Sequence, residues 1–565
     1  MDVTNQNFLE LLPEIAETIK ECDFIAIDTE LSGLLRERSV NMFDLPGERF
    51  ARNIESSRGY FIMQFGLSCF TRTDCLRYNN KTYNFYIFPQ PNGQYGDLNR
   101  TFSLQAHAIQ FLSEHGFDFN KLFKHGVSYL TFQEKKVIIA RLKSDNKARH
   151  KVELNSNGLP KFVPKSMVND CQNWMKKTKK YIDDMKLASG QEGIGDRINS
   201  SCDSGGGDGK NAGSGDWLEL RDCSSNHRRA IMRRLLECQP MFENLEIENK
   251  HDPEKNETFL AVRYIDKAMK EENQRNALVA AKGFLEILEL VILNRKPIVG
   301  HNLALDLIQI INQFIEPLTD DYSSFKEICH SLFPHVYDTK FIAHSILDPE
   351  TLTSNQSRLD HLYCQLRDSE TFPKLRVEQT GESFDRNQVP HQAGYDAYMS
   401  GYCFIVLCAA FLKKNKKLKQ LTNSTNDQQV SIAQEETIID EFSNKIHLSY
   451  SYDFKYYDLG GDEDQPNRDH VFYIECPPTW CLEDIFQVFY PFGGVKVSWL
   501  GKNSALCALR DPSKTGAVLD KCRAAKTNHG SNYRIFDYET YLKSFKPKET
   551  SHADDSSSDV EFYDA

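Results

Sequence analysis

Two carboxylates separated by one residue end an apolar run near the start of the chain. Residues 24–30 read FIAIDTE, which places Asp28 and Glu30 directly after a run of Phe, Ile and Ala. Side chains alternate between the two faces of a strand, so this pattern predicts a buried strand with both carboxylates on one face. Mg²⁺ suits such a pair, because it takes oxygen ligands and keeps positions open for water and a phosphate. Ordinary polar residues at a strand end are the alternative until other ligands are found.

A third and a fourth carboxylate follow later elements of the chain. Residues 297–300 (PIVG) predict a short buried strand, and Asp306 stands in the segment that leads from it into a helix. His391 and Asp396 begin a long apolar helix that reaches residue 413. As isolated features, Asp306 and Asp396 are typical of helix starts, where the helix dipole favours a negative charge.

Taken in chain order, these residues resemble the site of the DEDDh exonucleases. The matching residues are Asp28, Glu30, Asp306, His391 and Asp396. The resemblance implies that the four carboxylates hold two Mg²⁺ ions, about 3.5–4 Å apart, that align the attacking water and neutralise the leaving 3′-oxygen. His391 is the expected general base, since the ordinary histidine pKa of about 6.5 suits proton removal at neutral pH. Gly394 is expected to leave the loop free, so that His391 swings over the site.

Five longer stretches resemble the poly(A)-specific ribonuclease (PARN) family, in the same order along the chain. They are FIAIDTELSG, GFDFNKLF, IVGHNLALDLI, FPHVYDTK and HQAGYDAYMSG. The resemblance implies a Mg²⁺-dependent 3′-exoribonuclease that prefers adenosine tails and releases 5′-AMP. It also implies a homodimer, and a ribonuclease-H-like fold of the DEDD type interrupted by a small R-three-H-like domain.

Three further positions match residues that bind RNA or its cap in this family. Leu34 and Lys340 match positions near bound adenosines, and Trp499 matches the position that stacks on a 7-methylguanosine cap. Each has an ordinary structural alternative: Leu34 as core, Lys340 as a surface cation, and Trp499 as a partly buried strand residue. A cationic purine nevertheless suits stacking between aromatic or apolar surfaces.

The pattern of apolar and polar segments predicts an α/β protein of several domains, which the length of 565 residues allows. Residues 189–215 are dense in Gly, Ser and Asp and cannot bury a core, so we expect them to be disordered. The predicted parts are residues 1–150 and 266–425 (nuclease domain), 151–265 (inserted R-three-H-like α/β domain), 440–545 (α+β module similar to an RNA-recognition domain, RRM) and 546–565 (disordered acidic tail).

Both RNA-type modules depart from their usual motifs. In the inserted domain, Arg221 and His227 are not four residues apart, as an R-x-x-x-H motif requires, although HRRAIMRR still predicts a basic helix. The C-terminal module has the expected β-α-β-β-α-β order, but Ser504 and Leu506 stand where its third strand should carry stacking aromatics. Neither module therefore gains strong support as an RNA-binding surface.

Composition limits the compartment and the mode of binding. The net charge of −12 argues against a protein coated by nucleic acid, although local basic clusters still allow phosphate contacts. The 15 cysteines include no C-x-x-C pair and are expected to be reduced, mostly buried thiols. No leader or membrane-spanning run is evident, so we expect a cytoplasmic protein without a membrane partner. The nucleus and perinuclear RNA granules are alternatives, since KKNKK at residues 413–417 can act as an import signal.

Three functions compete at this point. The first is a 3′-to-5′ exoribonuclease that shortens messenger poly(A) tails or trims small non-coding RNA precursors, such as those of piwi-associated RNAs, with or without an accessory protein. A catalytically silent RNA-binding adaptor is disfavoured, because all five catalytic residues are present. A DNA-directed 3′ exonuclease is disfavoured by the RNA-type modules.

Overall fold

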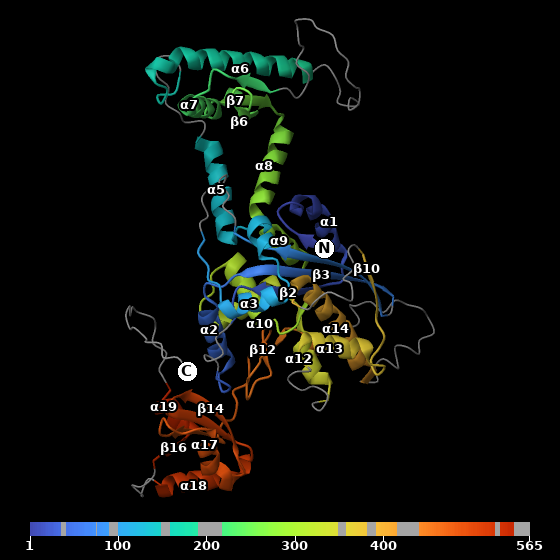
Figure 1. The fold of residues 1–565 in the computed structure, drawn as a ribbon, viewed down its shortest axis with the longest axis vertical. Coiled ribbons are helices and arrows are strands. Elements are labelled where there is room, and N and C mark those ends of the chain that lie inside the picture. The colour runs from blue at the N-terminus through green and yellow to red at the C-terminus, as the bar shows by residue number, and fades with distance from the viewer. Residues whose placement is uncertain are drawn as a thin grey trace.

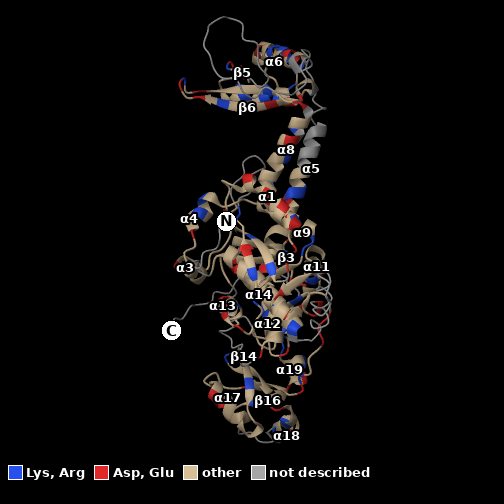
Figure 2. Cartoon of the chain, turned by 90° about the vertical axis from the view of Figure 1, so that its right-hand side faces the viewer, with Lys and Arg blue, Asp and Glu red and all other residues tan. Residues whose placement is uncertain are grey.

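Three parts lie along the long axis of the computed structural model, with an inserted domain above a central domain and a C-terminal module below it (Figure 1). Basic and acidic residues are interspersed along the described parts of the chain (Figure 2). Most of the predicted disordered loop, the predicted tail and the end of KKNKK lie outside the described residues. The structure describes residues 1–34, 41–74, 76–89, 100–148, 159–189, 217–348, 357–380, 391–414, 440–525 and 532–546.

A mixed sheet organises the central domain. Its nine described strands lie in the order β1-β4-β3-β2-β8-β9-β11-β12, with β10 beside β4. Strands β2, β3 and β4 are antiparallel, whereas β2, β8, β9 and β11 run parallel. The bounds are Asp2–Val3 (β1), Phe24–Leu31 (β2), Ile62–Asp74 (β3), Arg77–Tyr86 (β4), Ile298–Gly300 (β8), Val336–Asp338 (β9), Arg376–Gln379 (β10), Lys445–His447 (β11) and Tyr456–Asp458 (β12).

Helices cover both faces of this sheet, because the strands carry apolar residues on both sides. In β2, Ile25 and Ile27 pack on one side with α1, α9 and α10, while Phe24 and Ala26 pack on the other with α12, α13 and α14. The bounds are Phe8–Glu21 (α1), Pro46–Ser57 (α2), Ala106–Glu114 (α3), Phe119–His125 (α4), Phe284–Asn294 (α9), Ala304–Ile310 (α10), Tyr322–Leu332 (α11), Thr339–Ile346 (α12), Leu359–Asp368 (α13) and Ala393–Lys414 (α14).

Helix α14 is the long apolar helix that the sequence predicts after His391. Among the described helices, it is the one that is long and apolar enough to cross a membrane, over Ala393–Lys413. Of the most apolar stretch of this helix, 78% is buried inside the protein. The helix packs across β2 and β3 and belongs to one of the two main cores. Its apolar composition is therefore accounted for by packing on the sheet.

Residues 440–458 complete the sheet of the central domain, although the sequence predicts that the C-terminal module begins at residue 440. Strand β11 pairs with β9, and β12 pairs with β11. Ile446 and Tyr457 are buried in the same core as Ile25. A three-residue strand carries too little periodic pattern to reveal which sheet it joins, so the boundary shifts to after Asp458.

Two helices, α5 (Phe132–Ala148) and α8 (Lys267–Lys282), connect the inserted domain to the central domain (Figure 1). Its described strands form a sheet in the order β5-β7-β6, and α6 and α7 pack on one face around the buried Trp174. The described core lies within the predicted range of 151–265. The bounds are Val168–Ser189 (α6), Leu218–Leu220 (β5), Asn226–Glu237 (α7), Leu245–Asp252 (β6) and Glu257–Tyr264 (β7).

The C-terminal module has the predicted β-α-β-β-α-β order and a sheet in the order β14-β15-β13-β16. Phe472 and Ile474 of β13 face α17 and α18, where a compact apolar core forms. A further helix, α19, follows the last strand. The bounds are Val471–Glu475 (β13), Leu482–Phe489 (α17), Val495–Gly501 (β14), Ser504–Leu509 (β15), Thr515–Ala525 (α18), Arg534–Asp537 (β16) and Tyr538–Ser544 (α19).

Candidate active site

The end of β2 carries the first two carboxylates on the face that packs against α14. Asp28 and Glu30 share this face with Phe24 and Ala26, which belong to the α14 side of the core. Thr29 lies between them and points to the opposite face. The alternation of side chains along one strand thus places both carboxylates together.

Asp306 reaches the same end of the sheet from the other face, where it stands in the first turn of α10. The Thr29 hydroxyl donates a hydrogen bond to Asp306 Oδ1 at 2.5 Å. Thr29 was not predicted to have a role, although its position between the two carboxylates follows from the strand pattern. Its hydroxyl fixes the orientation of the third carboxylate.

His391 and Asp396 come from the entry to α14 and from its first turn. The His391 backbone N–H points at the Asp396 carboxylate, 3.2 Å from Oδ2 and 3.4 Å from Oδ1. His391 has a φ of 78°, a left-handed conformation that non-glycine residues rarely adopt and that recurs at functional sites. Its ring packs edge-on against Phe111 and His115, with centroids 4.5 and 4.4 Å away.

Buried polar side chains of β3 and β4 hold the entry to α14. The Ala393 N–H donates to Gln64 Oε1 at 2.9 Å, and the Gly394 N–H donates to Asn84 Oδ1 at 3.0 Å. Gln64 is 0% and Asn84 4% exposed, so these bonds satisfy helix-terminal amides inside the protein. The expectation that Gly394 leaves the loop free is therefore wrong. This glycine permits close packing instead, since a Cβ there would lie 3.0 Å from Asn84 Cβ.

Gly66 lets α14 approach the sheet at the catalytic end. It lies opposite Asp28 in the β2–β3 pairing, and a Cβ at this position would lie 1.9 Å from the Ala393 carbonyl oxygen. A glycine inside a strand is a recognised sign of a close backbone approach. The glycine in the strand therefore indicated that some backbone approaches here, but the sequence did not show that this backbone is the start of α14.

We expect Gly66→Ala to reduce catalysis about 10²-fold, because displacing a catalytic group by about 1 Å can cost that much. The added methyl group has to push the backbone that leads into Asp396 away from Asp28. The matched control is Gly516→Ala, because a Cβ at Gly516 meets nothing within 4 Å. Release of AMP from oligo(A) and the melting temperature are measured for both variants. Full activity of the Gly66 variant would show that α14 does not depend on this contact.

Burial raises the pKa values of all four carboxylates. Burial is the main cause for Asp28 and Glu30, whose pKa values lie well above the ordinary range, and the charges of Asp396 and Asp306 add to it. Burial also raises the pKa of Asp306 to about 6 and that of Asp396 to about 7. Negative charge is therefore unfavourable here unless cations are present.

The residues fit a divalent cation. Ligand atoms of Glu30, His391 and Asp396 all lie within 4.8 Å of one another. The donors are mostly carboxylate oxygens, which suit Mg²⁺. The sequence analysis expected His391 to act as a base rather than a ligand, and its ring lies inside this group. The charge of Asp306 acts on Asp28 and on Glu30, so these carboxylates belong to the same site.

His391 is a weaker base than the sequence suggests. Burial, followed by the nearby His115 and Arg358, lowers its pKa to about 4. The imidazole is therefore uncharged at neutral pH and free to accept a proton. This pKa lies below the ordinary histidine value on which the sequence analysis relied, because the ring is partly buried and a second histidine packs against it.

Asp338 connects the segments that surround this site. Its carboxylate accepts hydrogen bonds from the backbone N–H groups of Asn302 (2.9 Å), Leu303 (3.1 Å), Lys340 (2.9 Å) and His447 (3.0 Å). It thereby joins the entry to α10, the start of α12 and strand β11. The sequence analysis singled out Lys340 in the YDTK motif but missed Asp338, which is 0% exposed.

The two predicted RNA-binding positions are accessible to different degrees. Leu34 follows β2 and is 54% exposed, so the core alternative does not hold for it. Its N–H donates to Gln105 Oε1 at 2.7 Å, which fixes the backbone next to the carboxylate strand. Lys340 stands at the start of α12, where burial lowers the pKa of its ammonium group.

One face of the C-terminal sheet is closed by other parts of the chain. Tyr473 and Leu506 are 7% and 3% exposed, and they cluster with Phe43 of the central domain. The Tyr473 ring stacks on the rings of Tyr541 and Phe545, and its centroid lies 5.2 Å from the first and 4.8 Å from the second. Single-stranded RNA therefore cannot stack on the middle of this face in the way that RRM domains bind it.

Trp499 lies on β14, at the edge of the same sheet. Its side chain is half-buried and packs on the opposite side, against the core formed with α17 and α18. The Trp499 ring contributes to this core, and part of its surface remains accessible to solvent. Both the structural alternative and a stacking role are compatible with this position.

Comparison with known proteins identifies relatives of the whole chain. The CAF1 family ribonuclease pattern matches residues 3–404, and an RNA binding domain pattern matches residues 461–544. The poly(A)-specific ribonuclease PARN of Homo sapiens is 30% identical over 558 residues, which cover 96% of this chain and 80% of that protein. The pre-piRNA 3′-exonuclease trimmer of Bombyx mori is 26% identical, covering 96% and 94%. The S. pombe Pop2p structure in its Mg²⁺- and Mn²⁺-bound form aligns with a TM-score of 0.32 and 14% identity, covering 72% of this chain and 90% of that one.

The α/β sheet with clustered carboxylates and the matched patterns define a ribonuclease with an attached RNA-binding domain. The chain belongs to the CAF1 family of ribonucleases, in the branch that contains PARN, and it is a 3′-to-5′ exoribonuclease. The predicted family, the α/β fold class with a C-terminal RNA-binding domain and the enzyme class are thereby confirmed, whereas the R-three-H-like character of the inserted domain stays a prediction.

Proposed function

We propose that this exoribonuclease removes nucleotides from single-stranded RNA with a free 3′-hydroxyl, releases 5′-nucleoside monophosphates and prefers oligo(A) ends. The observation that carries the proposal is the group of four carboxylates, of which Asp306 and Asp396 raise the pKa values of Asp28 and Glu30, with His391 at one end of the sheet. The preference for adenosine follows the name of the PARN relatives, which match this chain over 96% of its length.

The roles of the side chains follow from their positions. Asp28, Glu30, Asp306 and Asp396 would hold two Mg²⁺ ions, which when bound supply the positive charge that favours ionisation of water and departure of the 3′-oxygen. His391 accepts a proton from the attacking water, since its imidazole is neutral and lies beside Glu30 and Asp396. Leu34 and Lys340 contact the terminal nucleotides, one through its exposed apolar side chain and the other through its charge.

Small non-coding RNA precursors are the second candidate substrate. The silkworm pre-piRNA trimmer matches nearly the full length of both chains, at 96% and 94% coverage. Sequencing of RNA 3′ ends in cells that lack this protein distinguishes the two substrates. Extended small RNAs would support trimming, whereas longer messenger tails would support deadenylation.

We expect the purified protein with Mg²⁺ to release AMP from oligo(A) faster than it releases the monophosphates from oligo(C) or oligo(U), and to leave oligo(dA) intact. The Asp306→Asn variant should be inactive at ordinary Mg²⁺ concentrations, because it lacks one carboxylate charge. Equal cleavage of DNA would favour the DNA-directed alternative. Binding of RNA without cleavage by the parent would favour the adaptor alternative.

We also propose that Trp499 stacks on a 7-methylguanosine cap. Its place on an edge strand and its partial exposure support this proposal. Trp499→Ala should weaken binding of a cap analogue roughly tenfold or more, in keeping with about 1–3 kcal/mol per stacked base. Processing of uncapped RNA should not change. The matched control is Trp480→Ala, which removes the other tryptophan of this core; equal cap binding by parent and Trp499 variant would contradict the proposal.

A homodimer is a proposal that rests on the family resemblance, and we also propose an accessory protein and a cytoplasmic location. Sedimentation velocity at graded protein concentrations tests the dimer. A constant monomer mass over the working range would contradict it. Affinity purification and imaging of the tagged protein test the accessory protein and the location.

A further inference from the structure

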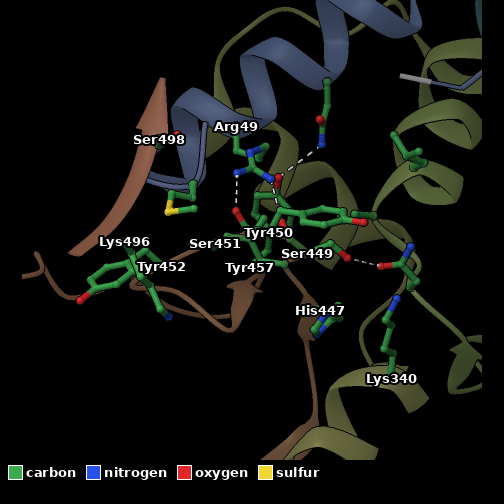
Figure 3. A pocket seen from close by; sticks show the side chains of 16 residues that line it. Arg49, Lys340, His447, Ser449, Tyr450, Ser451, Tyr452, Tyr457, Lys496 and Ser498 are labelled. Atoms are coloured by element: carbon green, nitrogen blue, oxygen red, sulfur yellow. Dashed lines mark hydrogen bonds between the residues drawn. The ribbon is translucent and has the colours of Figure 1, made fainter. Parts of the chain in front are cut away.

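A cleft of about 800 Å³ lies between the central domain and the C-terminal module (Figure 3). Its walls come from α2, the starts of α10 and α12, the segment 447–452 and strand β14. The start of α10 also carries Asp306, which follows the lining residue Leu305 in sequence. The cleft therefore runs from the helix that carries one catalytic carboxylate to an edge strand of the RNA-binding domain.

The described lining of this cleft is positive. It includes Arg49, Lys340 and Lys496, and no Asp or Glu is among the described residues that line it. Arg49 is engaged within the protein, because its guanidinium pairs with the buried Asp44, with Nε 3.3 Å from Oδ2, and donates to the carbonyl oxygens of Ser449 at 2.8 Å and Tyr450 at 3.2 Å. Within the described part of the chain, no acidic side chain forms a salt bridge with Lys340 or Lys496. The exposed Lys496 is thus available to a phosphate group, whereas Lys340 is partly buried and interacts with the charge of Asp338.

Aromatic rings accompany these charges. Tyr450 is 84% exposed and has a φ of 55°, a left-handed conformation that costs free energy in a residue with a side chain. The two hydrogen bonds from Arg49 hold this turn and leave the Tyr450 ring outside the core. The Tyr452 ring lies 5.1 Å from Lys496 Nζ and is partly buried against Phe43, with ring centroids 5.1 Å apart. An exposed ring such as Tyr450 in a cleft with cations is the combination that binds the bases and phosphates of single strands.

Strand β14 supplies the module's side of the cleft. Lys496 and Ser498 lie opposite Ala508 and Leu506 of β15, whose side chains belong to the face that Phe43 and α19 cover. Lys496 and Ser498 therefore lie on the covered face of the sheet, at the edge where this face borders the cleft. Trp499 points to the other side of the strand, because successive side chains alternate. The cleft and the proposed cap position are on opposite faces of β14.

We propose that this cleft binds the stretch of single-stranded RNA upstream of the 3′ end that is being removed. Lys496 contacts a phosphate, and the exposed Tyr450 ring stacks on a base. This inference rests on the proposed function and extends the RNA path beyond Lys340 to the C-terminal module. RNA long enough to reach β14 is then held by both domains, whereas a very short RNA is held by the central domain alone.

Kinetics with two RNA lengths test this proposal in the full chain. Lys496→Glu and Tyr450→Ala should each raise the KM for a long oligo(A) roughly tenfold, given the usual contribution of one stacked base or phosphate contact. The KM for an adenosine trinucleotide, which we expect the central domain alone to hold, should stay the same. Lys502→Glu is the matched control, because Lys502 is exposed in the turn after β14 and does not line the cleft. Melting temperatures verify that each variant is folded.

Two outcomes separate this proposal from the proposed function. A parent protein that cleaves neither RNA overturns the proposed function. A parent that cleaves both, with cleft variants that equal it on both lengths, overturns the cleft alone and assigns this surface to a different kind of partner. In addition, an oligo(A) with a photoreactive base in its interior should cross-link to segment 447–452 or to β14. Cross-links confined to the inserted domain would overturn the proposed path even if the KM values changed.

Discussion

We expect the Asp28→Asn variant to lose cleavage of oligo(A) and, when divalent cations are removed with a chelator, to unfold at a higher temperature than the parent. Loss of activity follows because one of four clustered carboxylates is gone. The gain in stability follows because burial and the neighbouring Asp396 and Asp306 oppose the charge on Asp28. An amide of nearly the same shape removes that unfavourable charge.

The direction of the pH effect follows from the raised pKa values. With pKa values of about 6 for Asp306 and about 7 for Asp396, the folded chain binds protons that the unfolded chain, with pKa values of about 3.9, has already released. The free energy of unfolding of the metal-free parent therefore falls as pH rises from about 4 to about 7, and the loss is complete above the folded pKa values. Asp28→Asn should weaken this dependence.

Thermal unfolding measures this prediction. At about pH 8 in chelator, the variant should melt several degrees above the parent, since each kcal/mol corresponds to about 2–4 °C in a domain of this size. Mg²⁺ should raise the melting temperature of the parent more than that of the variant. The control is Asp511→Asn, because a hydrogen bond from Ser513 lowers the pKa of that exposed carboxyl and its loss brings no stabilisation. A variant that is less stable than the parent in chelator would contradict the electrostatic account of the site.

We expect His391→Ala to reduce kcat by about 10²–10⁴-fold, the usual contribution of a general base, while the affinity for RNA stays nearly constant. Because the pKa of His391 is lowered to about 4, the imidazole is neutral throughout the neutral range. The ratio of parent to variant kcat should therefore be constant between about pH 6 and about pH 8. An imidazole with the ordinary pKa of about 6.5 would instead make this ratio fall on the acid side.

The measurement compares parent and variant across pH at saturating Mg²⁺. His330→Ala, which removes an exposed histidine of α11, is the control for histidine substitution as such. A variant that keeps the full rate, or one whose defect is restored by additional Mg²⁺, would show that His391 is not the base. The second result would instead make the ring a metal ligand, which its distance from Glu30 and Asp396 also allows.

Local pattern was sufficient for much of the architecture. The apolar run before Asp28 and Glu30 predicts both the strand and the face on which the carboxylates lie, because alternation along a strand is a property of the backbone alone. The order of elements in the C-terminal module was predictable for the same reason. The family resemblance then connected Asp306, His391 and Asp396 to the strand, which no local pattern could do.

Other features depend on contacts between segments that are far apart in the chain. Gln64 and Asn84 hold the entry to α14 across more than 300 positions of sequence separation. Phe43 closes the sheet of the C-terminal module, and residues 440–458 join the central sheet rather than that module. The lowered pKa of His391 likewise requires His115 and burial beside it. Such contacts depend on which surfaces complement each other after folding, and neither periodicity nor propensity within one segment contains that information.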